Sequence, residues 1–396
     1  KNSKVAFIYG AAGTGKSTMI NYISSLFKDK QKIFLANTNP AVENLRRKVT
    51  AEHAEFVTIT KFLSKDVSND CDILCLDECS TISNRDMVRV LQRAQCKLLV
   101  LVGDIYQIES ILFGNWFNIA YKVMPKDSVA ELTRPHRTTV QGLIEVWNKV
   151  REITEDRLEF ITRNGLSSTL DESIFSRTEE DEIVLCLNYD GIYGINNINK
   201  FLQSNNVNPS INWGVLSYKV GDPVLFNESN RFAPLVYNNL KGKILQIEEE
   251  EDCIYFTIEV YTVLNELDVI GFDLELKESV TDETSVIRFK VGRGGDGNDD
   301  NDNVENVVPF QVAYAISIHK AQGLEYESVK VVITSEIEEM VSHNIFYTAI
   351  TRAKSKLKIY WSPETEKRIL ENMKGQFNDK DYQLFKAKYK EALLKS

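Results

Sequence analysis

A glycine-rich octapeptide, GAAGTGKS, stands between an apolar run and a helical pattern near the beginning of the chain. The run KVAFIY precedes it and predicts a strand, and TMINYISSLF follows it and predicts a helix. Glycines at this spacing let backbone N–H groups surround an anion, and the N-terminus of the following helix favours negative charge. Residues 10–17 therefore predict a nucleotide-phosphate site at a strand-loop-helix junction.

Side chains within this loop supply the rest of the predicted site. Lys16 is expected to reach the outer phosphates, and the hydroxyl of Ser17 is expected to ligate magnesium. We therefore expect ATP and Mg²⁺ as cofactors. The residues of this loop that we expect to contact the nucleotide are Gly10, Gly13, Thr14, Gly15, Lys16, Ser17 and Thr18.

Two later apolar runs end in polar residues of the kind that such a site needs. Residues 72–76 lead into Asp77 and Glu78, and residues 97–102 lead into a segment that ends at Gln107. One carboxylate can hold magnesium while its neighbour orients the attacking water. We assign these roles to Asp77 and Glu78, with an ordinary surface turn as the alternative.

The length and composition point to several domains. A chain of 396 residues with 43% apolar content can fill two or three cores. It has no run of eighteen apolar residues, so we expect no membrane span and a soluble, cytoplasmic protein. The six cysteines are predicted to be buried free thiols. For Cys71, Cys75 and Cys79 a metal site is the alternative, although residues on one strand cannot converge on one ion.

The net charge of −10 is unusual for a nucleic-acid enzyme, because binding to phosphates favours a basic surface. Acidic residues gather in segments 248–252 and 294–303, outside the motifs. We predict a mobile, solvated loop near residues 292–306, and a calcium site is the alternative for its aspartates.

Eight segments together resemble the motifs of a known family. In order they are GAAGTGKS, NTNPAVENL, TITKFL, LDECS, GDIYQ, ELTRPHRTT, SIHKAQGLEYESV and FYTAITRAKSKLKIYW, and they resemble the successive motifs of superfamily 1 helicases. KVGDPVLFNESN followed by NNLKGKI is similar to the small barrel inserted in RecD-like members. The family's adenine-reading glutamine lies upstream of the phosphate loop, so we expect a longer protein with an N-terminal nuclease or partner-binding part.

The resemblance implies an α/β fold with two RecA-like domains, each built on a parallel sheet, and a small β-barrel insertion in the second. The first domain would span residues 1–150 and a linker region residues 151–181. The second would combine residues 182–216 and 307–396, interrupted by a β-rich, barrel-like module with an acidic loop at 217–306.

The resemblance also implies roles for individual residues. The expected catalytic set is Lys16, Asp77, Glu78, Gln107, Arg137 and Arg352, with Ser17 and Asp77 as metal ligands. Beyond the loop, the expected nucleotide contacts are His136, Gln322, Gly323 and Glu325. The expected nucleic-acid contacts are Thr38, Asn39, Thr60, Phe62, Ser317, His319 and Lys320, and Trp116 is a further candidate for stacking on bases.

Several of these roles have alternatives. Thr38 and Asn39 can begin a helix at Pro40, and a helix cap and a phosphate contact can coexist. Phe62 and Trp116 can be core residues. Arg134 competes with Arg137 for the role of arginine finger, and a surface salt bridge is the alternative for either.

The expected function is an ATP-dependent helicase or translocase motor on single-stranded nucleic acid, with DNA favoured over RNA and movement from 5′ to 3′. The alternative is a nucleic-acid-stimulated ATPase that translocates or signals without unwinding. A catalytically idle scaffold is disfavoured because the expected catalytic set is intact.

Overall fold

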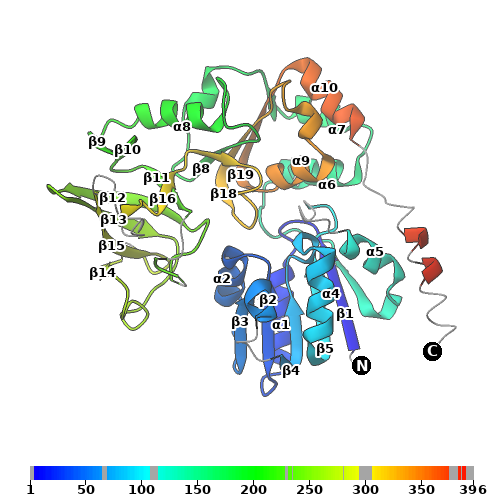
Figure 1. The fold of residues 1–396 in the computed structure, drawn as a ribbon. Coiled ribbons are helices and arrows are strands. Elements are labelled where there is room, and N and C mark those ends of the chain that lie inside the picture. The colour runs from blue at the N-terminus through cyan, green and yellow to red at the C-terminus, as the bar shows by residue number, and fades with distance from the viewer. Residues whose placement is uncertain are drawn as a thin grey trace. The chain divides into compact units, whose positions relative to one another are not determined.

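The computed structural model describes residues 4–64, 69–107, 115–227, 231–233, 235–279, 281–293, 306–373, 382–384 and 386–388. The chain divides into two compact units. Unit 1 comprises Lys1–Ser167, Ser335–Lys358 and Ser362–Ser396, and unit 2 comprises Ser168–Thr334 and Ile359–Trp361. Figure 1 labels most of the helices and strands of each unit.

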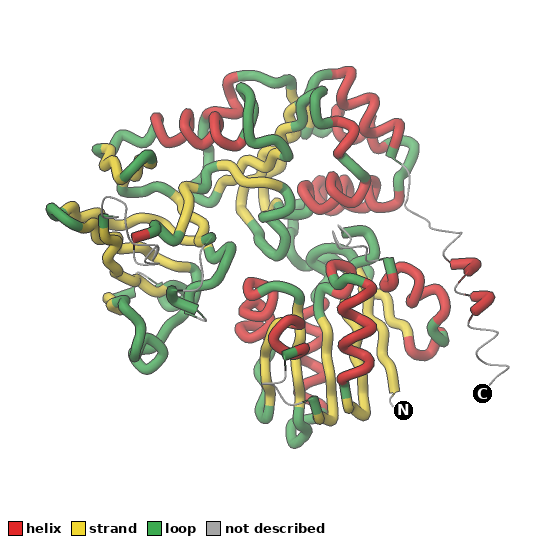
Figure 2. The backbone as a smooth tube through the Cα atoms, viewed as in Figure 1, coloured by secondary structure: helices red, strands yellow, loops and turns green. Residues whose placement is uncertain are grey.

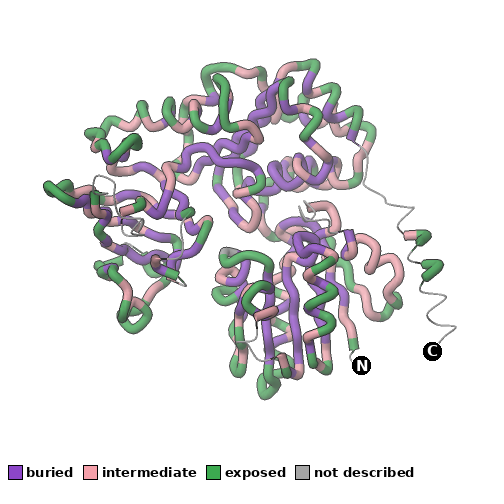
Figure 3. The backbone as a smooth tube through the Cα atoms, viewed as in Figure 1, coloured by how far each residue is buried: buried purple, intermediate pink, exposed green. Residues whose placement is uncertain are grey.

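Unit 1 is built on a six-stranded sheet with the order β3-β2-β4-β5-β1-β6. Every paired strand in it runs parallel to its neighbour. The strands are β1 (Lys4–Gly10), β2 (Lys32–Ala36), β3 (Ala54–Thr58), β4 (Asp70–Leu76), β5 (Gln95–Gly103) and β6 (Val129–Leu132). Strand β2 is buried along its whole length, as expected for the interior of a sheet covered on both faces (Figure 3).

Helices cover both faces of this sheet and enclose a separate apolar core on each. Side chains of α1 (Lys16–Leu26) and α2 (Asn39–Lys48) pack in one core. Those of α3 (Ile59–Leu63), α4 (Asn84–Arg93) and α5 (Trp116–Val123) pack in the other. Cys71 and Cys75 of β4 belong to different cores. All six cysteines are free thiols, and all but Cys96 are buried.

A helical layer completes unit 1. It contains α6 (Gln141–Glu152), α7 (Arg157–Arg163), α9 (His343–Ile350) and α10 (Pro363–Asn372). The indole N–H of Trp147 on α6 donates to the carbonyl of Ile350 at 3.0 Å, and Arg157 donates to the carbonyl of Leu370. These bonds attach segments that follow residue 335 to segments that precede residue 167.

The second sheet has the order β17-β8-β18-β19-β7. Strand β8 (Glu182–Cys186) pairs in parallel with β17 (Ala315–Ser317) and β18 (Tyr326–Val332). The boundaries between the units fall within its other two strands, β7 (Ser167–Ser168) and β19 (Ala353–Tyr360). Helix α8 (Ile195–Ser204) packs against this sheet through Ile195, Ile198 and Leu202.

Unit 2 also contains a six-stranded antiparallel sheet, drawn as yellow strands in Figure 2, with the order β14-β15-β13-β12-β11-β16. Its strands are β11 (Pro223–Phe226), β12 (Lys241–Glu249), β13 (Cys253–Val260), β14 (Glu275–Lys277), β15 (Ser285–Gly292) and β16 (Phe310–Val312). Packed aromatic rings, including Phe256 and Phe310 with centroids 5.0 Å apart, fill its core. The hairpin β9 (Ser210–Trp213) and β10 (Leu216–Lys219) stands beside it in the chain.

These elements confirm the α/β class with parallel sheets and the β-rich nature of the segment after residue 217. Closure of the antiparallel sheet into a barrel stays a prediction, as do the domain boundaries. The segment predicted as a linker, 151–181, contains α7, β7 and a 3₁₀ helix at Glu172–Phe175. The acidic run 294–303 lies outside the described residues. None of the helices in the described residues combines the length and the apolar character that a membrane span requires.

A buried ion pair in unit 2 gives a test of this packing. The ammonium of Lys330 lies 3.0 Å from the carboxylate of Glu182, and both side chains are almost inaccessible to solvent. Lys330→Met should cost about 3 to 5 kcal/mol of unfolding free energy, because it leaves a buried carboxylate without its counter-charge. Adding Glu182→Gln should restore part of that loss. Urea unfolding followed by tryptophan fluorescence measures both, and a loss below about 1 kcal/mol in the single variant would contradict the assignment.

Candidate nucleotide site at the carboxyl edge of the parallel sheet

The parallel sheet of unit 1 places the ends of six strands along one edge. The phosphate loop follows β1, and the acidic pair Asp77 and Glu78 follows β4. Gln107 lies in the turn after β5, and its N–H approaches the carbonyl of Asp104 at 3.4 Å. The carboxyl edge of a parallel sheet is where ligands bind in folds of this class. The residues predicted from three separate motifs therefore lie at one edge.

The glycines of the loop are required by its geometry. A Cβ on Gly10 would lie 2.5 Å from the carbonyl oxygen of Leu132, and one on Gly13 would lie 2.4 Å from the Cβ of Arg137. Gly13 and Gly15 have φ angles of 72° and 83°, which side-chain-bearing residues rarely adopt. The hydroxyl of Thr14 donates to the carbonyl of Ala11 at 2.9 Å, a hydrogen bond within the loop.

Lys16 and Ser17 begin helix α1 directly behind the loop. The ammonium of Lys16 donates to the carbonyls of Gly10 and Ala11 at 2.9 and 2.8 Å. Burial lowers the pKa of Lys16, and the charges of Asp104, Asp77 and Glu78 oppose that shift. The charges of three carboxylates therefore act on this ammonium.

Of those three residues, Asp77 and Asp104 are buried and Glu78 is half-buried. Burial raises the pKa of Asp77, whose carboxylate accepts the N–H of Glu78 at 2.8 Å. Burial also raises the pKa of Asp104, against the effect of Lys16. The pKa of Glu78 is raised to about 7, first by burial and then by the charge of Asp77. Carboxyl groups with raised pKa values beside cations are common at functional sites.

The two predicted arginines belong to the same cluster. Arg352 is 2% exposed, and its guanidinium donates to the carbonyl of Thr348 at 3.0 Å. Arg137 donates to the carbonyl of Thr351 at 2.6 Å. Both positive charges act on Glu78, where they oppose the rise in its pKa. The backbone N–H of His136, the residue before Arg137, donates to the carbonyl of Gly13 at 2.5 Å.

The residues of unit 1 that are predicted to contact nucleic acid differ in their exposure to solvent. Thr38 and Thr60 follow the ends of β2 and β3 and are exposed, and so is Asn39. Thr38 caps α2 by accepting the N–H of Ala41 at 3.4 Å, which confirms the predicted cap.

Phe62, in contrast, is wrongly predicted to stack on bases. It is fully buried in the core that α4 and α5 share, because its position on the short helix α3 faces the sheet. Trp116 is half-buried and packs against the same core, where its indole N–H donates to the carbonyl of Ile82 at 2.9 Å. Neither aromatic ring is presented as a free surface for a base.

Six predicted residues lie in unit 2, at the last residue of β17 and in the turn that leads to β18. His319 is exposed, whereas Ser317 is 7% exposed and its hydroxyl accepts the N–H of Lys320 at 3.2 Å. The ammonium of Lys320 donates to the side chain of Gln311 at 2.9 Å. Gly323 has a φ of 77°, and its neighbours Gln322 and Glu325 are half-buried.

The structure adds residues that the sequence analysis did not assign. Asp104 follows β5 at the end of a run already recognised as a strand, so its position could have been read from the sequence. Arg151 lies on α6 with its guanidinium 5.8 Å from the centre of the Tyr106 ring, and its charge acts on Asp104. No sequence motif marks Arg151. Tyr347 lies within FYTAITR, five residues before Arg352.

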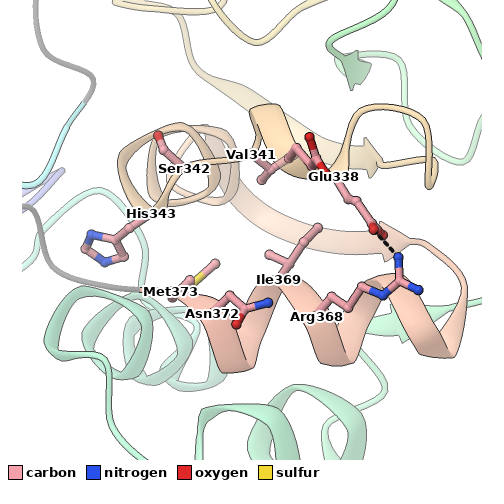
Figure 4. A pocket seen from close by; sticks show the side chains of 9 residues that line it. Glu338, Val341, Ser342, His343, Arg368, Ile369, Asn372 and Met373 are labelled. Atoms are coloured by element: carbon pink, nitrogen blue, oxygen red, sulfur yellow. Dashed lines mark hydrogen bonds and ion pairs between the residues drawn. The ribbon is translucent and has the colours of Figure 1, made fainter.

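A cavity of about 450 Å³ lies between the N-terminus of α9 and the C-terminus of α10 (Figure 4). On one wall Glu338 pairs with Arg368 and accepts the hydroxyl of Thr365 at 3.1 Å. On the other, a ring nitrogen of His343 contacts the carbonyl of Val150 at 2.7 Å. These polar groups stabilise the packing of α9 and α10 rather than converge on the cavity.

Comparisons with known proteins agree with this geometry. A family model described as an AAA domain matches residues 1–171, and one described as a UvrD-like helicase C-terminal domain matches residues 312–360. The RecBCD enzyme subunit RecD of Mycolicibacterium smegmatis is 23% identical over 73% of this chain. The chain spans 50% of the length of that relative.

Two Pif1 proteins are also similar to this chain. The ATP-dependent DNA helicase Pif1 of Campylobacter jejuni is 23% identical over 89% of this chain and 88% of its own length. The crystal structure of Pif1 helicase from Bacteroides in complex with ADP-AlF3 and ssDNA has a TM-score of 0.56 at 16% identity. That match covers 98% of this chain and 94% of the other, and it shows a shared fold. Together the matches confirm the predicted resemblance to superfamily 1 helicases.

The raised pKa of Glu78 predicts a stability change with a defined dependence on pH. The pKa of Glu78 is about 7 in the folded protein, against 4.5 for an ordinary glutamate, so ionisation of this group lowers the unfolding free energy. This loss of unfolding free energy develops as the pH rises from 4.5 through about 7, and it is constant at higher pH. Glu78→Gln should therefore raise the unfolding free energy at pH 8 by roughly 1 to 3 kcal/mol and change it little at pH 4.5. Thermal unfolding at both pH values, with the exposed Glu55→Gln as control, measures this. An equal change at both would contradict it.

Proposed function

We propose that this chain, which belongs with the superfamily 1 helicases, is the ATP-hydrolysing motor of a helicase that moves along single-stranded DNA. The observation that carries the proposal is the cluster at the carboxyl edge of the parallel sheet. There Glu78, with a pKa of about 7, lies within electrostatic reach of Lys16, Arg137 and Arg352 beside a glycine-rich loop.

The residues present fit a nucleotide with magnesium. Glycine occupies the loop positions where a Cβ would collide with neighbouring atoms. Without side chains at these positions, the backbone N–H groups are accessible to phosphate oxygens. The Ser17 hydroxyl and the Asp77 carboxylate offer the oxygen ligands that magnesium prefers. One carboxylate oxygen of Asp104 is buried without a hydrogen-bond partner within the described part of the chain, so it can accept from a metal-bound water. ATP would supply the phosphoryl group, and magnesium would neutralise its charge.

The protein side chains then have distinct roles in hydrolysis. Glu78, when ionised, would orient a water molecule and accept its proton, whereas Lys16 would hold the outer phosphates. Arg137 and Arg352 would offset charge that develops on the transferring phosphoryl group, which is the main catalytic need in this reaction. Gln107, in the turn after β5, would sense the terminal phosphate. His136, Gln322, Gly323 and Glu325 are proposed to border the nucleotide.

Single-stranded nucleic acid is the polymer along which we propose that the motor moves. Three exposed residues follow the ends of β2 and β3: Thr38, Asn39 and Thr60. In the sheet, β4 with the acidic pair lies between these two strands and β1, which carries the phosphate loop. Short polar side chains and the N-terminus of α2 suit contacts to a phosphate backbone without base reading. In unit 2, Ser317, His319 and Lys320 are proposed as further contacts. DNA is favoured because the Pif1 relative is a DNA helicase.

The remaining architecture is part of the proposal. The first RecA-like domain would span residues 1–150 and the second residues 182–216 and 307–396. The antiparallel sheet of unit 2 would be the inserted small barrel, which would guide the strand that enters or leaves the motor.

ATP turnover measured with single-stranded DNA, with single-stranded RNA and without nucleic acid tests the function. We expect hydrolysis that single-stranded DNA stimulates and that falls at least about a hundredfold in Lys16→Ala, because the variant loses the charge that holds the outer phosphates. Lys28→Ala, on the exposed segment after α1, is the matched control and should keep full turnover. Turnover that survives Lys16→Ala in a folded sample would overturn the site assignment.

Direction of movement is tested with tailed duplexes. We expect unwinding of a duplex that carries only a 5′ single-stranded tail, by the similarity to RecD and Pif1 proteins. Activity confined to 3′-tailed duplexes would contradict the 5′ to 3′ direction. ATP turnover stimulated by single strands without unwinding of either duplex would favour the alternative, a translocating ATPase.

A further inference from the structure

The hydroxyl of Tyr347 touches the phosphate loop itself. Tyr347 lies on α9, is fully buried, and its hydroxyl oxygen accepts the backbone N–H of Ala12 at 3.2 Å. Ala12 is the third residue of the loop and is 1% exposed. A side chain more than 330 residues away in the chain therefore holds one of the N–H groups of the loop.

A hydroxyl that accepts one hydrogen bond still has a proton to donate. Within the described residues, no acceptor for the Tyr347 proton is found. Burial, reinforced by the charge of Asp104, raises the pKa of Tyr347 far above its usual value, so the hydroxyl keeps its proton at neutral pH. Tyr347 is thus a neutral donor beside the loop.

The charges around Tyr347 are those of the candidate nucleotide site. Asp104, Arg151 and Arg137 all act on its hydroxyl, and Arg137 also acts on Glu78. The hydroxyl therefore belongs to the same electrostatic environment as the residues proposed to hold and cleave ATP.

Helix α9 is fixed in place at both ends. At its first residue, His343 contacts the carbonyl of Val150, and at its last residue the carbonyl of Ile350 accepts the indole N–H of Trp147. The rings of Tyr106 and His343 lie 6.3 and 6.4 Å from the ring of Tyr347. Figure 4 shows His343 at the start of the helix. A side chain held this firmly can orient a hydrogen bond with little loss of entropy.

We propose that Tyr347 is a further nucleotide-contacting residue, whose hydroxyl donates a hydrogen bond to an oxygen of the terminal phosphoryl group of ATP while it accepts the N–H of Ala12. This inference rests on the proposed ATPase function. Through Tyr347, α9 would distinguish ATP from ADP, because only ATP carries the terminal phosphoryl group that accepts this hydrogen bond.

The variant Tyr347→Phe removes only the oxygen atom and tests the proposal. With Mg²⁺ present, affinities for ADP and for the β,γ-imido analogue of ATP are measured by calorimetry. We expect affinity for the analogue to fall about tenfold, as for loss of a hydrogen bond to a charged acceptor, while affinity for ADP changes less than about twofold. The preference for the ATP analogue over ADP should therefore fall by about the same factor.

Tyr360→Phe is the matched control. Its hydroxyl is hydrogen-bonded to the Ser173 hydroxyl at 2.9 Å, and Tyr360 is 2% exposed whereas Tyr347 is fully buried, so both variants lose one hydrogen bond of a buried tyrosine. It should leave both affinities unchanged. A purely structural role for Tyr347 would lower both affinities together, or neither, and either result would overturn the proposal.

The outcomes also separate this inference from the proposed function. If the unaltered protein binds the ATP analogue, and Lys16→Ala abolishes that binding, an unchanged preference in Tyr347→Phe overturns only the role of Tyr347. If the unaltered protein does not bind the analogue, or binds it equally well after Lys16→Ala, the proposed function fails and the role of Tyr347 fails with it.

Discussion

The parallel hydrogen bonding of the six strands in unit 1 is the constraint on which the candidate site depends. In a parallel sheet every strand ends at the same edge, so loops that are far apart in the chain meet there. Strand β1 delivers the phosphate loop, β4 the acidic pair and β5 Asp104, and these three strands are neighbours in the sheet. An antiparallel arrangement of the same strands would send alternate loops to opposite edges.

Two apolar cores flank this sheet, and burial beside them makes the charges at its edge costly. Burial raises the pKa values of Asp77, Glu78 and Asp104, and it lowers that of Lys16. In each case burial disfavours the charged form, and the oppositely charged neighbours recover only part of the cost.

The segment Ser335–Lys358 gives unit 1 its second source of site residues. Trp147 and His343 attach α9 to α6, and Arg137 contacts the turn that carries Arg352. Through these contacts the sixth motif adds an arginine and a tyrosine hydroxyl to a loop that the first motif forms. The candidate site therefore includes residues from a segment that follows residue 335, in addition to those of the N-terminal sheet.

The sequence by itself determined the strands and the residues at their ends. Local patterns are enough for this, because strand, glycine-rich loop and helix follow one another directly in the chain. The positions of Lys16, Asp77, Glu78 and Gln107 after predicted strands could be read in this way, and their roles in the site stay predictions. Only the tertiary structure decided the positions of Phe62, Arg151 and Tyr347. Whether a ring faces a core or a surface, and whether a hydroxyl meets a loop residue 335 positions away, depends on packing between elements that no local pattern records.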